Sequence, residues 1–244
     1  MRFDPPPVAA RFLRRYKRFL ADVRLEDGST VVAHVPNTGS LLGVARPDID
    51  ALVQPAHRPG RKLDWTLVAL RPGRTWVGIH TQFAMHLARE AIEAGIVFDP
   101  RDFDSIRAEV PYGPNRRSRI DFLLERHTGG DLSHRIYVEV KNTTLVRDRP
   151  DGRTALFPDA PTARGRKHLA DLVWAREHGH RAALIFTVQR SDCDAFAPAE
   201  DIDPAYAEGL RRAHAAGVEI HALAAHRVGP RGVRLSRTLP VRLA

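Results

Sequence analysis

Two runs, Arg119-Ile-Asp-Phe-Leu-Leu124 and Ile136-Tyr-Val-Glu-Val-Lys141, decide how the rest of the chain is interpreted. Both are rich in apolar residues, and the segment between them carries two glycines, Gly129 and Gly130. Apolar runs separated by a glycine-containing loop predict a β-hairpin. We therefore expect these two runs to be adjacent strands of one sheet.

The hairpin places acidic side chains on its polar face. Side chains alternate along a strand, so Glu139 and Lys141 share a face with Tyr137. A symmetric hairpin is centred on Gly130, which sets Asp121 directly opposite Glu139 with Cβ atoms roughly 4.5–5.5 Å apart. Two carboxylates this close repel each other unless something neutralises them.

A divalent cation is the natural partner for such a pair. Mg²⁺ and Mn²⁺ take oxygen ligands, commonly one or two carboxylates with waters and a substrate phosphate. Lys141, on the same face, can hold or polarise a water beside the ion. Asp121, Glu139 and Lys141 are thus a minimal set for metal-assisted phosphodiester hydrolysis. On spacing alone, a solvated face with cross-strand ion pairs is the favoured interpretation, and it is the rest of the chain that shifts the balance toward a metal site.

Composition points to a globular protein with a polyanionic partner. The chain has 244 residues, 43% hydrophobic and 27% charged, which is enough apolar material for a core. Its net charge of +9 suits nucleic acid, although an arginine-rich coding bias gives the same surplus. The single cysteine, Cys193, excludes an intramolecular disulfide and fits a cytoplasmic protein. It has no cationic neighbours in sequence, so we expect an inert thiol. No apolar run approaches the length of a membrane span, and nothing predicts an oligomeric state.

Residues 1–79 predict a small β-barrel of the OB type. Short strand patterns without a convincing helix follow one another in this region. They are expected at residues 19–25, 30–35, 51–54, 65–71 and 75–79.

Residues 80–244 predict a second domain, a mixed sheet flanked by helices. Helical patterns begin near Thr81, a candidate N-cap, and near Thr162, and end at Gly95 and Gly179; a third covers 204–216. Strands are expected at 105–110, 117–125, 135–146, 181–188 and 218–223, with one or two edge strands in 228–243. The chain as a whole is therefore α/β.

Two further segments carry candidate nucleic-acid ligands. The first combines basic and aromatic residues on the predicted barrel, a combination that binds single strands. Its members are Arg14, Arg15, Tyr16, Lys17 and Arg18, whereas the neighbouring Phe12 and Phe19 are expected in the core. The sequence leaves three roles open for Asn37 and Thr38: they form only a turn, they contact a phosphate, or they help to join the two domains. At the start of the second helix, Arg164, Lys167 and His168 suit a phosphate, or are a solvated first turn.

These motifs together resemble a known family. The order of elements, with an acid on one strand and Glu-x-Lys on the next, resembles the PD-(D/E)xK nuclease core. The full chain resembles more specifically the sugar fermentation stimulation protein A family. The segments that carry this resemblance are Arg15-Tyr-Lys-Arg-Phe-Leu-Ala-Asp-Val23, His34-Val-Pro-Asn-Thr-Gly39, Ser118-Arg-Ile-Asp-Phe-Leu123, Tyr137-Val-Glu-Val-Lys141 and Phe157-Pro-Asp-Ala-Pro-Thr-Ala-Arg-Gly-Arg-Lys-His-Leu169.

The resemblance implies roles for individual residues. Asp121 and Glu139 correspond to the metal-binding acids and Lys141 to the catalytic lysine, with the Val140 carbonyl and, from the first helix, Glu90 as further candidate ligands of Mg²⁺ or Mn²⁺. Ile120 precedes Asp121, so the Pro-Asp dipeptide itself is absent from that strand. Pro158-Asp159 spells it, but lies after Glu-x-Lys, in the wrong order to supply the acid.

Three hypotheses for function follow. The first is a metal-dependent nuclease, with DNA favoured over RNA and no membrane partner. The second is a DNA-binding regulator of sugar-utilisation genes that keeps the fold without turnover. The third is a metal-binding protein for a small phosphorylated ligand.

Overall fold

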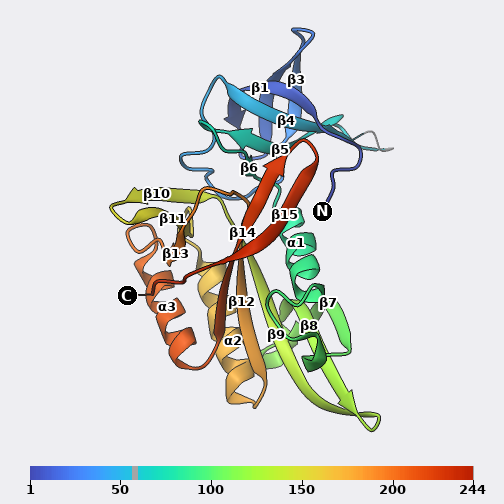
Figure 1. Cartoon of the computed structure of the whole chain (residues 1–244), viewed down its shortest axis with the longest axis vertical. Helices are drawn as coiled ribbons and strands as arrows, with labels where there is room; N and C mark the ends of the chain where they lie inside the picture. Colours follow the sequence, from blue (N-terminus) through green and yellow to red (C-terminus); the bar gives the residue numbers. More distant parts are fainter. Residues whose placement is uncertain (57–59, 244) are drawn as a thin grey trace.

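The computed structural model of the chain describes residues 1–56 and 60–243. A small barrel sits at one end, and a larger unit built on a long twisted sheet forms the rest (Figure 1). No helix within these described ranges is long and apolar enough to cross a membrane.

The barrel is formed by the first six strands. They are β1 Val8–Tyr16, β2 Leu20–Leu25, β3 Thr30–His34, β4 Ile49–Pro55, β5 Trp65–Arg71 and β6 Val77–Gly78. They pair in the order β3-β2-β1-β4-β5-β6, and a parallel pairing of β3 with β5 closes the barrel. Closure leaves no free edge between these strands. The predicted OB-type barrel is confirmed.

Two details of the barrel differ from the prediction. Strand β1, Val8–Tyr16, was not among the expected strands, the first of which was placed at 19–25. Phe12 is buried as expected, at 1% exposure, whereas Phe19 is 41% exposed. The prediction for Phe19 was wrong because this residue lies in the turn between β1 and β2, where strand alternation does not apply.

A six-stranded sheet is the centre of the larger unit. Its strands are β7 Ser105–Tyr112, β8 Ser118–Thr128, β9 Asp131–Thr143, β12 Arg181–Val188, β14 Glu219–Gly229 and β15 Gly232–Leu239. The order is β15-β14-β12-β9-β8-β7, in which β12 runs parallel to β9 and β14 while the other pairs are antiparallel. Short 3-10 turns at Pro100–Asp102 and Pro114–Arg116 precede β7 and β8.

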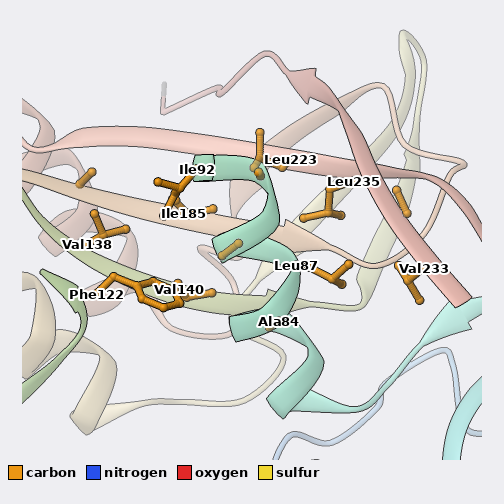
Figure 2. Packing of buried hydrophobic residues seen from close by; sticks show 14 of the residues in the cluster. Ala84, Leu87, Ile92, Phe122, Val138, Val140, Ile185, Leu223, Val233 and Leu235 are labelled. Atoms are coloured by element: carbon orange, nitrogen blue, oxygen red, sulfur yellow. The ribbon is translucent and has the colours of Figure 1, made fainter. Parts of the chain in front are cut away.

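Helices cover both faces of this sheet. Helix α1, Thr81–Glu93, packs on one face, and α2, Ala163–Glu177, and α3, Pro204–Ala215, pack on the other. Figure 2 shows the first interface, where apolar side chains of α1 point onto the sheet. Labelled there are Ala84, Leu87, Ile92, Phe122, Val138, Val140, Ile185, Leu223, Val233 and Leu235. A fully buried Leu or Ile stabilises the fold by about 1.5–3 kcal/mol.

The helix ends follow the expected chemistry with one exception. Thr162 caps α2 by accepting a hydrogen bond from the Gly165 N–H, and Gly95 and Gly179 follow α1 and α2 with positive φ. The residue at the N-cap of α1 is His80, not Thr81. Thr81 is instead the first residue of the helix, and its hydroxyl donates to the Pro36 carbonyl of the barrel.

A second sheet was not predicted. It contains β10 Leu145–Arg149, β11 Gly152–Phe157 and β13 Ala195–Pro198, in that order. The apolar residues before 147 suggested one strand to Val146, but β9 ends at Thr143 and β10 belongs to the separate sheet.

The barrel and the larger unit are joined by several hydrogen bonds. The Gly78 N–H donates to the Gln189 carbonyl, and the Thr81 N–H donates to the Pro36 carbonyl. Across the other side of the interface, Asp159 accepts from the Leu41 N–H at 3.0 Å. These contacts place a barrel loop, residues 36–41, against the loop that precedes α2.

Candidate active site

The carboxylates of Asp121 and Glu139 lie where β8 and β9 separate. Backbone pairing between these strands extends to Phe122 opposite Val138 and follows the predicted register. One step further in the same register sets Asp121 opposite Glu139. At that point Asp121 Oδ2 accepts the Val140 N–H at 2.6 Å, so a side chain takes the place of a backbone acceptor.

The turn of the hairpin is tighter than the sequence suggested. Thr128 pairs with Asp131, which leaves Gly129 and Gly130 as a two-residue loop. Their φ angles are +64° and +94°, the left-handed values that two-residue hairpin turns favour. A bulge between Arg126 and His127 then shifts the register by one residue, so the turn and the bulge together set the pairing that places Asp121 opposite Glu139.

Glu139 is the most buried member of the site, with 2% of its surface exposed. Its Oε1 atom contacts both His168 Nδ1 and Lys141 Nζ. Its Oε2 atom is also buried, and among the described residues it has no hydrogen-bond partner. Buried carboxylate oxygens are normally paired, so the second oxygen is available to a ligand.

The two acids differ in how readily they ionise. Burial, together with the charge of Glu139, raises the pKa of Asp121 to about 7. Burial also acts to raise the pKa of Glu139, but His168 and Lys141 outweigh it and leave that pKa below its usual value. The site therefore holds one charge readily, whereas a second charge requires further positive compensation.

His168 lies at the centre of this cluster, and on α2 rather than on the hairpin. It is 9% exposed. Besides Glu139, its Nδ1 lies 3.3 Å from Lys141 Nζ, and its Nε2 lies 3.3 Å from Arg164 Nε. His168 and Arg164 are four residues apart and therefore share one face of α2. The structure brings both to the acids, although His168 is buried on Glu139 and is not displayed as a surface phosphate ligand.

Two of the other candidates lie elsewhere. Lys167 points away from the acids and contacts Asp171 at 2.7 Å and the Ser118 hydroxyl, because it occupies a different face of α2. Glu90 binds the amino group of Met1 at 2.8 Å, at another position on α1. The structure thus does not place Glu90 among the ligands of Asp121 and Glu139.

The site opens into a cavity of about 500 Å³ that both domains line. From the larger unit come Asp121, Glu139, Lys141, Arg164 and His168. From the barrel come Asn37, Thr38 and Gly39. The cavity, which we call the acid cavity, is therefore an interdomain feature.

The barrel loop at this cavity is held by Asn37 and Arg15. The Asn37 side chain is buried, donates to the Ile79 carbonyl and accepts the Gly39 N–H. Arg15 donates to the backbone carbonyls of Arg18, Asn37 and Gly39. Both residues therefore shape the loop. Of the candidates on this segment, Thr38 is the one left to face the cavity.

The basic segment lines an adjoining cavity of about 650 Å³. It is bordered by Arg14, Arg15, Tyr16, Lys17, Arg18 and Thr38, and we call it the basic cavity. Arg14 pairs with Asp22 at 2.6 Å and lies 5.3 Å from the centre of the Tyr16 ring. Lys17 and Arg18 are exposed in the β1–β2 turn.

Oxygen donors suited to a hard cation are present. No group of three or more His, Cys, Asp or Glu side chains is arranged as a metal site within residues 1–56 and 60–243, so a cation would rely on two carboxylates, backbone and water. Val140 directs its N–H at Asp121, and in an extended strand its carbonyl points to the same edge. The unpartnered Glu139 Oε2 completes a donor set that fits Mg²⁺ or Mn²⁺.

Asp159 was missed as a site residue in the sequence. It lines the acid cavity and accepts hydrogen bonds from the barrel loop at Ser40 and Leu41. Gly39 packs directly against Asp159 and leaves no room for a side chain. A Cβ at this position would lie 2.5 Å from Asp159 Oδ2. Only the packing of the two domains reveals the pairing, because 120 positions separate these residues in the chain.

Comparison with known proteins agrees with this architecture. Residues 13–79 match the SfsA N-terminal OB domain, and residues 82–229 match the sugar fermentation stimulation protein RE domain. A sugar fermentation stimulation protein homolog of Pelobacter propionicus is 48% identical over 97% of this chain and 98% of its own length. One from Geotalea uraniireducens is 46% identical over the whole of both chains.

A solved structure extends the comparison to three dimensions. It is the Pyrococcus furiosus SfsA in complex with Ca²⁺, which is 29% identical to this chain, covers 99% of it and 98% of its own chain, and superposes with a TM-score of 0.85. Two domain matches in order and full-length relatives at nearly half identity leave one assignment: the chain belongs to the sugar fermentation stimulation protein (SfsA) family.

Proposed function

We propose that this protein is a divalent-metal-dependent phosphodiesterase that acts on nucleic acid, with DNA as the favoured substrate. The observation that carries the proposal is the buried Glu139 Oε2, which lacks a partner among the described residues and lies beside a second, partly buried carboxylate, Asp121. Such a pair is costly in a metal-free protein, and neutralisation by a cation accounts for it.

The residues take distinct roles in this proposal. Asp121, Glu139 and the Val140 carbonyl would hold Mg²⁺ or Mn²⁺, which when bound polarises a phosphate and lowers the pKa of a water. Lys141 keeps an ammonium next to Glu139, where it can donate to a phosphate oxygen or hold the attacking water. His168 orients the Glu139 carboxylate through Oε1, which leaves Oε2 without a hydrogen-bond partner among the described residues.

Two further observations support the choice of reaction. An acid on β8 followed by Glu-x-Lys on β9, in a mixed sheet with helices on both faces, has the arrangement of PD-(D/E)xK nucleases. The relative from Pyrococcus furiosus was solved with Ca²⁺, an ion that also takes oxygen ligands.

The choice of nucleic acid rests on charge and on the barrel. The chain carries a net charge of +9. The basic cavity shares Thr38 and Gly39 with the acid cavity, so cationic side chains border the route to the acids. OB barrels commonly bind oligonucleotides on such surfaces.

The test is cleavage of single- and double-stranded DNA and RNA with Mg²⁺, with Mn²⁺ and in EDTA. We expect metal-dependent hydrolysis that falls at least about 100-fold in Lys141→Met, a typical effect of removing one catalytic donor. Glu139→Gln and Asp121→Asn should abolish it and also weaken Mn²⁺ binding by calorimetry. Glu90→Gln is the matched control and should behave as wild type, because Glu90 lies outside the acid cavity. Hydrolysis that is absent with both metals, or equal in Glu139→Gln, refutes the proposal.

A second candidate is a DNA-binding regulator of sugar-utilisation genes that does not turn over. One observation favours it: Lys141 and His168 already offset the charge of Glu139 without a cation. This candidate predicts DNA binding that weakens steeply with salt and does not depend on Mg²⁺ or on Asp121→Asn.

A further inference from the structure

An exposed aromatic ring lies on the barrel beside the acid cavity. Phe19, in the β1–β2 turn, is 41% exposed, whereas Ala21 and Val23 on the following strand are fully buried. The ring of Phe19 stacks with His34 of β3, with centroids 6.5 Å apart and planes inclined by 26°. Exposure of one apolar residue is common on protein surfaces, but an exposed ring that stacks on a second ring presents a flat face to a ligand.

Phe19 and His34 line a cavity of about 540 Å³ whose other charged members are cations. Arg61 and Lys62 contribute these charges, and Arg61 is held by a hydrogen bond to the Thr66 hydroxyl. No carboxylate is found among the described residues that line it. Burial, and next the charge of Arg61, lowers the pKa of His34, so its ring is neutral near pH 7 and suited to stacking.

This aromatic cavity adjoins the acid cavity. The two share Asn37, Thr38, Thr81 and Gln82 as lining residues. Thr38 also borders the basic cavity. A strand whose phosphate lies at Asp121 and Glu139 can therefore extend past Thr38 and place a neighbouring nucleotide against Phe19.

We propose that Phe19 and His34 form a platform on which an unpaired nucleobase of the substrate stacks, while Arg61 and Lys62 neutralise the adjoining phosphates. The ligand class is single-stranded nucleic acid, or the single-stranded end of a duplex. The proposal rests on the proposed function for nucleic acid as the ligand, and deepens it by assigning the strandedness that the acid cavity alone leaves open.

The chemistry of the aromatic cavity selects an unpaired base. Every base has a flat π face that stacks on an aromatic ring, and this contact does not depend on sequence. In a duplex both faces of each internal base are already stacked, so the platform is accessible only to bases outside the helix. Exposed cations next to the ring suit the backbone phosphates of that nucleotide.

The decisive measurement is the affinity for fluorescein-labelled oligo-dT at low salt in EDTA, by anisotropy, with the full chain. Phe19→Ala should weaken this affinity about 5- to 150-fold, the range for losing one base–aromatic stack. Blunt duplex DNA should bind Phe19→Ala as it binds wild type. Leu132→Ala is the matched control, because Leu132 is equally exposed, at 40%, but lies on the hairpin β8–β9.

A second variant distinguishes the loss of base stacking from a change in the structure of the turn. Phe19→Trp keeps a flat ring and should retain oligo-dT binding, with indole fluorescence that is quenched on titration beyond the response of wild type. Unchanged oligo-dT affinity in Phe19→Ala, or equal losses for oligo-dT and duplex, overturns the platform even if the protein hydrolyses nucleic acid. Conversely, Phe19-dependent binding in a protein without hydrolytic activity retains the platform and removes the catalytic proposal alone.

Discussion

Replacing Asp121 with Asn should stabilise the metal-free protein at pH 8. The pKa of Asp121 is raised from its ordinary value of 3.8 to about 7 by burial and by the charge of Glu139. Because one pKa unit is worth about 1.4 kcal/mol, ionised Asp121 costs the folded state up to about 4 kcal/mol. Asn removes that charge and keeps an oxygen that can accept the Val140 N–H.

The pH dependence of this effect has a definite sign. A carboxyl whose folded pKa lies above its unfolded pKa destabilises the fold when ionised, so the penalty is fully present above pH 7. It disappears as the pH falls from about 7 to about 4. The difference in free energy of unfolding between Asp121→Asn and wild type should therefore be large at pH 8 and near zero at pH 4.

Urea unfolding in EDTA, followed by circular dichroism at both pH values, measures this difference. Asp192→Asn is a control of opposite sign. Burial acts to raise the pKa of Asp192, but Arg190 and Arg153 lower it to about 2, so its charge stabilises the fold above pH 4 by about 2 kcal/mol. An Asp121→Asn variant that is less stable than wild type at pH 8 would show that the two acids of the site do not oppose folding, and would refute the electrostatic reasoning.

Three other outcomes are expected. Mn²⁺ should raise the melting temperature of wild type in a thermal-shift assay and leave Glu139→Gln unchanged, since ligand binding to the folded state alone adds stability; an equal rise in both would place the ion elsewhere. Gly39→Ala should lower the free energy of unfolding, measured in urea, by about 1–3 kcal/mol, because its Cβ would lie 2.5 Å from the Asp159 carboxylate. A variant as stable as wild type would show that the barrel loop can move away from Asp159 without cost. Cys193 is buried, and burial raises the pKa of its thiol to about 12, so Ellman's reagent should modify it only after unfolding; rapid reaction in native buffer contradicts this.

Much of the fold could be predicted from periodicity and breaker residues. The apolar face of α1 at Ala84, Leu87, Ala88 and Ala91 is buried as its spacing predicts. The sheet of β10, β11 and β13 could not be foreseen, because β11 pairs in parallel with residues 41 positions later in the chain. Short strands of this kind owe their existence to packing partners and not to their own pattern.

Part of the candidate site could likewise be predicted from the sequence, and part of it could not. The pairing of Asp121 with Glu139 agrees with the register expected from a symmetric hairpin, but it also depends on a bulge between Arg126 and His127 that the sequence did not predict. The contact between His168 and Glu139 and that between Asp159 and the barrel loop depend on how helices and domains pack, so sequence spacing carried no signal for them. Phe19 shows the reverse error: the alternation of β2 was extended one residue too far, into a turn.

The candidate site lies where the regular backbone pairing between β8 and β9 ends. Beyond Phe122 and Val138, β8 stays with β7 while β9 stays with β12, and Asp121 fills the gap by accepting the Val140 N–H. A continuous ladder there would use backbone groups on both strands and leave no carbonyl for a ligand. Separation of the strands frees the Val140 carbonyl, and two acids next to it raise the energy of the metal-free state. The fold tolerates this loss because the surrounding strands β9 and β12 are buried between helices on both faces. The cost of placing the two acids together therefore falls where a bound cation would offset it.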